Sequence, residues 1–209
     1  MSEPTLRGYL YIISAPSGAG KTTLIRRIRE KRPEIRFSVS FTTRSPRPDE
    51  LPGRDYHFVS REEFLLGIED GRFLEWAEVH GHFYGTEVRQ IETGLAAGHD
   101  IILDIDVKGA SQVRCNYPQA HTIFIVPPSL DAIGLRLRQR NTESEQQLEK
   151  RLAAARQELQ LAPWFDFIVV NDVLEEALTH LLSILDACHC LGPHQAANLK
   201  PLLQSRPLR

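Results

Sequence analysis

The sequence predicts an α/β fold in which a mainly parallel sheet is covered by helices on both faces. Short apolar runs alternate with segments whose apolar residues recur at helical spacing, and this alternation is typical of parallel sheets. The first apolar run, residues 9–14, leads through a glycine-rich segment directly into a helical pattern. The 209 residues are enough for one compact domain with a sizeable core.

Each element has its own signal. Apolar runs rich in β-branched residues predict strands at residues 9–14, 101–105, 121–126 and 167–170. Helical spacing predicts helices at residues 22–32, 60–71, 88–95, 130–137, 142–159 and 174–185. Ser60, Ser129 and Thr142 stand where helix N-caps are expected, and Pro33 ends the first helix.

Two segments depart from the alternation. The stretch from residue 38 to residue 98 contains TTRSPRPDELPGRDYHF, in which prolines and glycines interrupt any long element. We therefore expect a small inserted subdomain there. The segment after about residue 191 is polar and contains proline, and no regular structure is expected for it.

Composition excludes several classes of protein. The 42% hydrophobic and 25% charged content argues against a disordered or fibrous chain, and a net charge of −2 argues against general attraction to nucleic acid. No apolar run has the length of a membrane span and the first residues do not resemble a secretory signal, so a cytoplasmic protein without membrane attachment is expected. Three cysteines form no disulfide framework; Cys188, His189 and Cys190 could ligate zinc, but without a second ligand pair a coincidence is favoured.

The segment between the first strand and the first helix predicts a phosphate-binding loop. Its residues are Ala15, Pro16, Ser17, Gly18, Ala19, Gly20, Lys21 and Thr22. Glycines let backbone N–H groups converge on phosphate oxygens, and the helix N-terminus adds positive partial charge. Lys21 would neutralise the β- and γ-phosphates and Thr22 would ligate Mg²⁺. Ala15 replaces the usual glycine, and the alternative is a glycine turn with a chance lysine.

Two carboxylates follow the apolar run at residues 101–103. Asp104 and Asp106 are two residues apart, so on a strand both would point to the same face, at the sheet edge where ligands collect. They could hold Mg²⁺ through water or accept hydrogen bonds from a base. The alternative is that one of them caps the turn at Gly109.

Several ordered motifs together resemble the guanylate kinase family. They are SFTTRSPR at residues 40–47, GRDYHFV at 53–59, FLEW at 73–76, YGT at 84–86 and LDID at 103–106. The resemblance runs from about residue 9 to about residue 186. It implies a P-loop NTPase fold and a cytoplasmic enzyme that transfers the γ-phosphoryl group of ATP to GMP with Mg²⁺.

The chemistry of the acceptor site can be read from the residues. Arg44 and Arg47, three residues apart beside a proline, could direct two guanidinium groups at one monophosphate. A carboxylate such as Glu75 accepts both N–H donors of the guanine edge, a pair that adenine lacks. The resemblance implies guanine contacts from Ser40, Glu75, Thr86 and Asp106, and phosphate contacts from Arg44, Arg47, Tyr56 and Tyr84. Thr86 stands where many relatives have serine, and a solvated basic loop is the alternative for the two arginines.

The resemblance also implies a lid at residues 130–160, a GMP-binding subdomain at 38–98 and a core of residues 1–37, 99–129 and 161–190. Arg140 and Arg151 match the catalytic lid arginines by spacing, and Arg44 would bridge the two substrates. Gln139 and Asn141 replace glycines that relatives often carry, and the alternative is that the arginines form an exposed helix face. Asn171 resembles a position near the ATP adenine, with helix capping as the alternative.

Two rival functions use the same fold. One is an interaction module that has lost catalysis, which the intact Gly-Lys-Thr argues against. The other is a kinase for a different nucleoside monophosphate or small metabolite, from which Glu75, Ser40 and Thr86 would distinguish this protein. The expected partners are ATP and GMP, with dGMP as a further acceptor and a homo-oligomer as the protein assembly considered.

Overall fold

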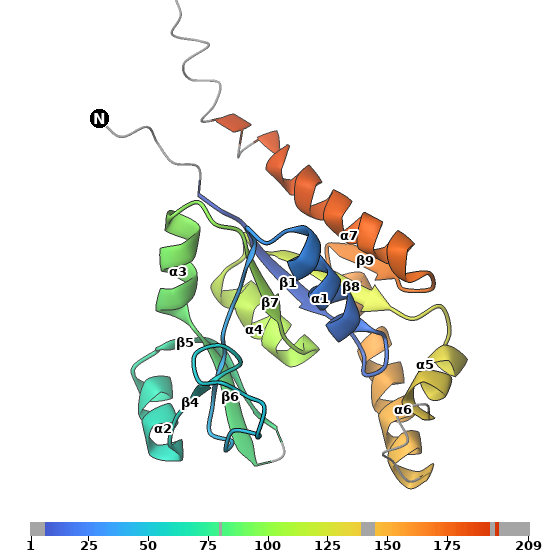
Figure 1. Ribbon diagram of the computed structural model, residues 1–209, viewed down its shortest axis with the longest axis horizontal. Helices are drawn as coiled ribbons and strands as arrows, with labels where there is room; N and C mark the ends of the chain where they lie inside the picture. Colours follow the sequence, from blue (N-terminus) through green and yellow to red (C-terminus); the bar gives the residue numbers. More distant parts are fainter. Residues whose placement is uncertain (1–6, 80, 139–144, 193–194, 197–209) are drawn as a thin grey trace, which may run out of the picture.

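A parallel five-stranded sheet forms the core of the computed structural model, which describes residues 7–79, 81–138, 145–192 and 195–196 (Figure 1). Its strands are β1 (Leu10–Ser14), β2 (Arg36–Phe37), β7 (Ile101–Asp104), β8 (His121–Val126) and β9 (Phe167–Val170). They lie in the order β2-β7-β1-β8-β9, and each pairs with its neighbour in parallel. The predicted α/β class is confirmed.

Helices cover both faces of this sheet, as predicted. Alternate residues of β1 point to opposite faces. Tyr11 and Ile13 pack with α1 (Lys21–Lys31) and α7 (Leu174–His189), whereas Leu10 and Ile12 pack with α3 (Val88–Ala96) and α4 (Val107–Asn116). Because both faces are covered, most residues of these strands are apolar.

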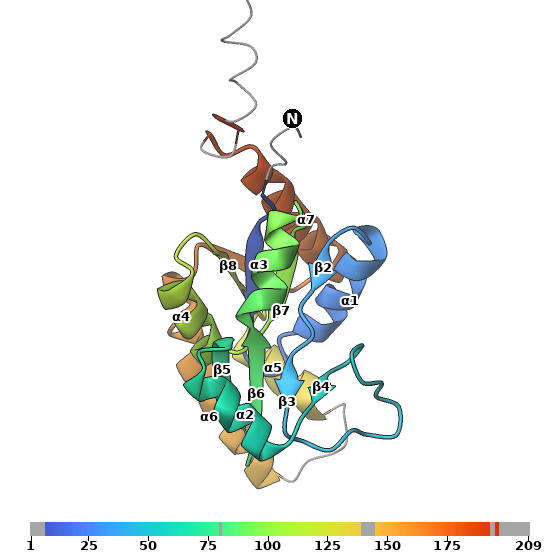
Figure 2. The same ribbon diagram turned by 90° about the vertical axis from the view of Figure 1, so that its left-hand side faces the viewer.

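A second, four-stranded sheet lies between β2 and α3 in the chain (Figure 2). Its strands are β3 (Phe41–Thr42), β4 (His57–Phe58), β5 (Phe73–Val79) and β6 (His82–Glu87), in the order β4-β3-β6-β5. Helix α2 (Arg61–Glu69) packs on it through an aromatic cluster of Phe41, Phe64, Phe73 and Phe83. This sheet and α2 lie at the lower left of Figure 1, away from α5 and α6 at the lower right.

The helices after β8 form a separate small cluster. Helix α5 (Leu130–Arg138) packs against α6 (Glu145–Leu159) through Ile133, Leu148 and Ala155, and a 3₁₀ turn, η1 (Ala162–Trp164), follows. The predicted Ser129 cap is confirmed, since its Oγ accepts from the Ala132 N–H at 3.1 Å. The predicted Thr142 cap lies outside the described residues.

The sequence analysis missed several elements. It assigned no helix to residues 107–116, where α4 lies, and no strands to the β5–β6 hairpin. It also extended β7 to Ile105, one residue past its end at Asp104. Among the described residues, no helix combines the length and apolar character needed to cross a membrane.

The start of α2 offers a test of local stability. Ser60 Oγ accepts from the Glu63 N–H at 3.0 Å, which satisfies one of the free donors of the first turn. Ser60→Ala should lower the free energy of unfolding by about 1 kcal/mol, measured by denaturant titration. Ser60→Asp keeps an acceptor and should retain most of that stability; equal loss in both variants would contradict the capping role.

Candidate active site

The loop between β1 and α1 has the backbone of a phosphate-binding loop. Gly18 and Gly20 have φ angles of 84° and 95°, a region that favours glycine, and Gly20 is the N-cap of α1. A Cβ at Gly20 would lie 2.3 Å from Asn171 Nδ2, so the position also lacks space for a side chain. The methyl group of Ala15 packs against the core cluster beneath α1 and α7. The replacement of glycine at position 15 is therefore accommodated.

Lys21 links this loop to the neighbouring strand. Its Nζ lies 2.7 Å from Asp104 Oδ1 and donates to the Ile105 carbonyl at 2.9 Å. Thr22 is exposed in the first turn of α1. The Thr22 hydroxyl and Asp104 carboxylate offer oxygen atoms, which Mg²⁺ prefers, and the ion ordinarily keeps several water ligands. These residues therefore fit a magnesium ion bound beside nucleotide phosphates.

A brace from two distant segments, α5 and the residue that follows β9, holds the loop. Asn171 is buried, and its Nδ2 donates to the Ala19 carbonyl at 2.7 Å. Arg136 of α5 donates to the same carbonyl at 3.3 Å and to the Asn171 carbonyl at 2.9 Å. The helix-capping alternative for Asn171 is wrong, because the N-cap of α7 is Val173. No local signal predicted the brace, because it joins residues far apart in the chain.

A buried carboxylate lies at the junction of the second sheet and α4. Glu75 of β5 is 6% exposed, and its Oε1 accepts from the Thr86 hydroxyl of β6 at 2.7 Å. Burial raises the pKa of Glu75 to about 7, the charge of Asp106 adds to the increase, and the Thr86 hydrogen bond opposes it. A Cβ at Gly109 would lie 3.0 Å from Glu75 Oε2, so glycine at this position leaves room for the carboxylate.

Asp106 corrects one sequence-based argument. Because β7 ends at Asp104, the alternation of a strand does not extend to Asp106, and the two residues do not form a same-face pair on one strand. Asp106 is the N-cap of α4, and its Oδ1 accepts from the Gly109 N–H at 2.8 Å. The capping alternative is thus confirmed for Asp106, which also lies close enough to Glu75 to influence its charge.

Arg44 lies beside Tyr56, one of the residues predicted to form an arginine–tyrosine clamp with it. The Arg44 guanidinium forms two hydrogen bonds with Glu50, at 2.8 and 2.9 Å, and lies 5.5 Å from the centre of the Tyr56 ring. The pKa of Arg44 is raised, chiefly by its hydrogen bonds to Glu50; burial opposes this increase, and the nearby Tyr84 side chain adds to it. Arg47 is exposed, and its backbone N–H donates to Glu50 Oε2 at 2.9 Å.

Electrostatics connect the clamp to the phosphate loop. Burial raises the pKa of Tyr56, and the charges around it include Arg44, Glu50 and Asp104. Asp104 in turn pairs with Lys21. The charge of Asp104 thus acts on Tyr56 as well as on Lys21. Ser40 is half-buried just before β3, and its carbonyl accepts from the His57 N–H at 2.9 Å.

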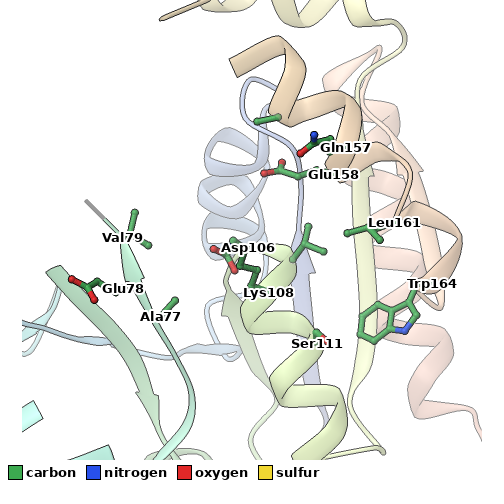
Figure 3. Close-up of a pocket in the computed structure, with 12 residues that line it drawn as sticks. Ala77, Glu78, Val79, Asp106, Lys108, Ser111, Gln157, Glu158, Leu161 and Trp164 are labelled. Carbon is green, nitrogen blue, oxygen red and sulfur yellow. The ribbon is translucent and has the colours of Figure 1, made fainter. Parts of the chain in front are cut away.

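A cavity of about 730 Å³ opens beside Asp106 (Figure 3). The end of β5, the first turns of α4 and the last turns of α6 with η1 line it. Glu158 of α6 points into it, and the backbone of Ser17 in the phosphate loop lies near enough to oppose the rise in the Glu158 pKa. Burial raises the pKa of Glu158, and the charge on Asp106 adds to this effect. The sequence analysis missed Glu158 because its spacing on α6 is that of an ordinary solvent-facing acid.

The predicted lid arginines are only partly described. Arg151 lies exposed on α6, and Arg140, Gln139 and Asn141 lie outside the described residues. The cysteine–histidine motif lies at the end of α7, where His189 Nε2 is 2.7 Å from Asp100 Oδ2. Among the residues that the structure describes, no group of three or more His, Cys, Asp or Glu residues could hold a metal ion.

Comparison with known proteins agrees with this geometry. A family model described as guanylate kinase matches residues 7–188. The chain belongs to the guanylate kinase family. It is 50% identical over 184 residues to the guanylate kinase of Thiobacillus denitrificans, and the match covers 88% of each chain. It is 51% identical over 174 residues to the guanylate kinase of Thermosynechococcus vestitus, and this match covers 83% of this chain and 91% of the relative.

A solved guanylate kinase structure has the same fold. The crystal structure of guanylate kinase from Anaplasma phagocytophilum matches with a TM-score of 0.75 and 33% identity, covering 100% of both chains. The P-loop NTPase fold implied by the sequence motifs is therefore confirmed.

The buried Glu75 predicts an unusual pH dependence of stability. Between its ordinary pKa of 4.5 and its folded pKa of about 7, the unfolded chain releases the Glu75 proton while the folded chain retains it. The Glu75 contribution to stability therefore falls as pH rises through this window and stays low above it. Glu75→Gln should raise the free energy of unfolding at pH 8 by up to about 3 kcal/mol, with the difference vanishing near pH 4.

Denaturant titrations at several pH values test this expectation. Glu78→Gln is the matched control, because Glu78 lies on the same strand and is exposed. The control should show no comparable trend with pH. If the difference in free energy of unfolding between Glu75→Gln and the unchanged protein did not vary with pH, the folded protein would keep this carboxylate charged.

Proposed function

We propose that this protein is a guanylate kinase that transfers the γ-phosphoryl group of ATP to GMP, giving ADP and GDP and so recycling GMP. The observation that carries the proposal is that Asp104, which pairs with Lys21, lies near enough to act on the charge of Tyr56, over whose ring Arg44 lies. Two groups suited to phosphate thereby border one site, as phosphoryl transfer requires of donor and acceptor.

The donor site would be the loop of residues 15–22. Its N–H groups would cradle the ATP phosphates, and Lys21 would exchange Asp104 for phosphate oxygens. Asn171 would lie near the adenine while bracing the loop through Ala19. Thr22 and, through water, Asp104 would hold Mg²⁺. The ion would neutralise phosphate charge.

The acceptor site would hold GMP between the second sheet and α4. Ser40, Thr86 and Asp106 would join Glu75 in contacting guanine, and Arg47, Tyr56 and Tyr84 would join Arg44 at the phosphate. On binding, Arg44 would exchange the Glu50 carboxylate for the phosphate, and each contact is a charge-assisted hydrogen bond. Adenine would leave the buried Glu75 without its donor pair, a mismatch that costs about four to five decades in comparable hydrogen-bonding sites.

Closure of the site would involve two segments. Residues 38–98 would act as the GMP-binding subdomain and residues 130–160 as the lid, against a core of residues 1–37, 99–129 and 161–190. Arg140 and Arg151 would stabilise charge on the transferred group, with Arg44 beside them. Closure over both nucleotides would exclude water and prevent loss of the phosphoryl group to hydrolysis. The cytoplasm, where ATP and GMP are used, is the proposed location, and homo-oligomer formation stays a prediction.

A substrate panel tests the proposed reaction. With ATP and Mg²⁺ present, GMP and dGMP should be phosphorylated in a coupled assay for ADP, whereas AMP, UMP and CMP should react at least about a thousandfold less well by kcat/KM. Preference for AMP or a pyrimidine nucleotide would favour the rival kinase. Binding of GMP without turnover would favour an interaction module.

Lys21 provides a second test. Lys21→Ala should lower kcat at least about a hundredfold, because the migrating phosphoryl group loses its fixed positive charge, while the calorimetric Kd for GMP should change little. Lys31→Ala, at the exposed end of the same helix, is the control and should keep normal kcat. Normal turnover by Lys21→Ala would refute the role assigned to this lysine.

A further inference from the structure

We propose that Gln112 and Asn116 of α4 are positioning residues that hold Glu75 in register for reading guanine. The inference rests on the proposed function, because Glu75 is the carboxylate assigned to the guanine edge. Neither amide reaches Glu75 itself. They act on the backbone of the residues immediately before and after it.

Gln112 pairs with the backbone of Trp76, the residue after Glu75. The Trp76 N–H donates to Gln112 Oε1 at 3.0 Å, and Gln112 Nε2 donates to the Trp76 carbonyl at 2.9 Å. Strand β5 is the outer strand of its sheet, so the N–H and C=O groups on its far side have no neighbouring strand. The Gln112 amide supplies one donor and one acceptor to this edge, as a paired strand residue would.

Asn116 acts on the other side of Glu75. Its Nδ2 donates to the Leu74 carbonyl at 2.9 Å. Gln112 and Asn116 are four residues apart on α4 and therefore lie on one helix face, one turn apart. Three hydrogen bonds thus join one face of α4 to the two residues that flank Glu75.

This attachment matters because the proposed guanine site is divided between two elements. Glu75 comes from β5 of the second sheet, whereas Asp106 caps α4 of the core. Glu75 Oε2 approaches α4 so closely that a Cβ at Gly109 would be 3.0 Å away. Hydrogen bonds weaken steeply as their angles depart from linearity, so recognition of two adjacent N–H groups requires a fixed spacing between these elements. The amides of α4 supply that constraint.

Packing alone constrains the junction less closely. Leu74 contributes its side chain to the core cluster that includes Val113 of α4, and this contact opposes separation of the two elements. Apolar contact is non-directional and tolerates small sliding movements. The hydrogen bonds of Gln112 and Asn116 fix the position of β5 along the helix. Their loss should therefore affect recognition more than folding.

The experiment measures base selectivity in Gln112→Ala and Asn116→Ala. For each protein, KM for GMP, KM for ATP, kcat and the inhibition constant of inosine monophosphate are determined. Inosine monophosphate keeps the ring N–H of guanine but lacks the 2-amino group. Displacement of Glu75 weakens two contacts to GMP and one to this analogue, so the preference for GMP should fall.

The expected result is a rise of about five- to tenfold in KM for GMP, which corresponds to the loss of one or two ordinary hydrogen bonds. The preference for GMP over inosine monophosphate should fall about threefold or more. KM for ATP should stay within about twofold of the unchanged protein, because the phosphate loop is held by other contacts. A lower melting temperature with unchanged preference would overturn the proposal.

Two controls make the outcome decisive. Ser60→Ala weakens the cap of α2 on the same sheet without touching α4, so it should lower the melting temperature while keeping the preference for GMP. Gln112→Met retains the side-chain length without the amide and replaces Gln112→Ala if the latter does not fold. If the unchanged protein did not phosphorylate GMP, the proposed function would fail; if it did and the variants kept its selectivity, the positioning role alone would fail.

Discussion

The rest of the site depends on the ion pair between Lys21 and Asp104, which lies at the carboxyl edge of the parallel sheet. Strands β1 and β7 are neighbours in the parallel sheet, so their carboxyl ends lie side by side and deliver the phosphate loop and Asp104 to one edge. Helix α1 begins at this edge with Lys21. The N-cap of α4, Asp106, lies two residues after the end of β7. The phosphate loop and the N-cap of α4 are thus positioned by two adjacent strands.

The second sheet is joined to this edge through polar contacts of different kinds. Glu75 is buried at the α4 junction, and because burial raises its pKa, its ionisation above neutral pH should oppose folding. The amides of Gln112 and Asn116 hold the strand that carries it. Thr86 donates one hydrogen bond to this carboxylate, and a base with two adjacent N–H groups would supply further donors.

Local signals predicted the phosphate loop, the caps at Ser60 and Ser129 and the strand that ends at Asp104, because each depends on a few consecutive residues. The signals failed for α4, whose sequence includes Gly109 and whose buried face is formed by small apolar residues. They also failed for the brace between Asn171 and Ala19 and for the approach of Glu158 to the phosphate loop, since residues so distant in the chain are brought together only by tertiary packing. Family resemblance located Glu75 and Thr86, but it did not indicate what holds them.

The partners of Lys21 and Arg44 have a kinetic consequence. Each cation is already paired with a carboxylate, Asp104 or Glu50, so the long-range field of each pair is that of a dipole and fades over a shorter distance than that of a bare charge. An approaching nucleotide is then drawn in weakly until it is close enough to displace the carboxylate. The rate of nucleotide association should therefore depend less on ionic strength than in proteins whose anion sites are lined by unpaired cations. Selection between nucleotides then occurs only after direct contact with the site.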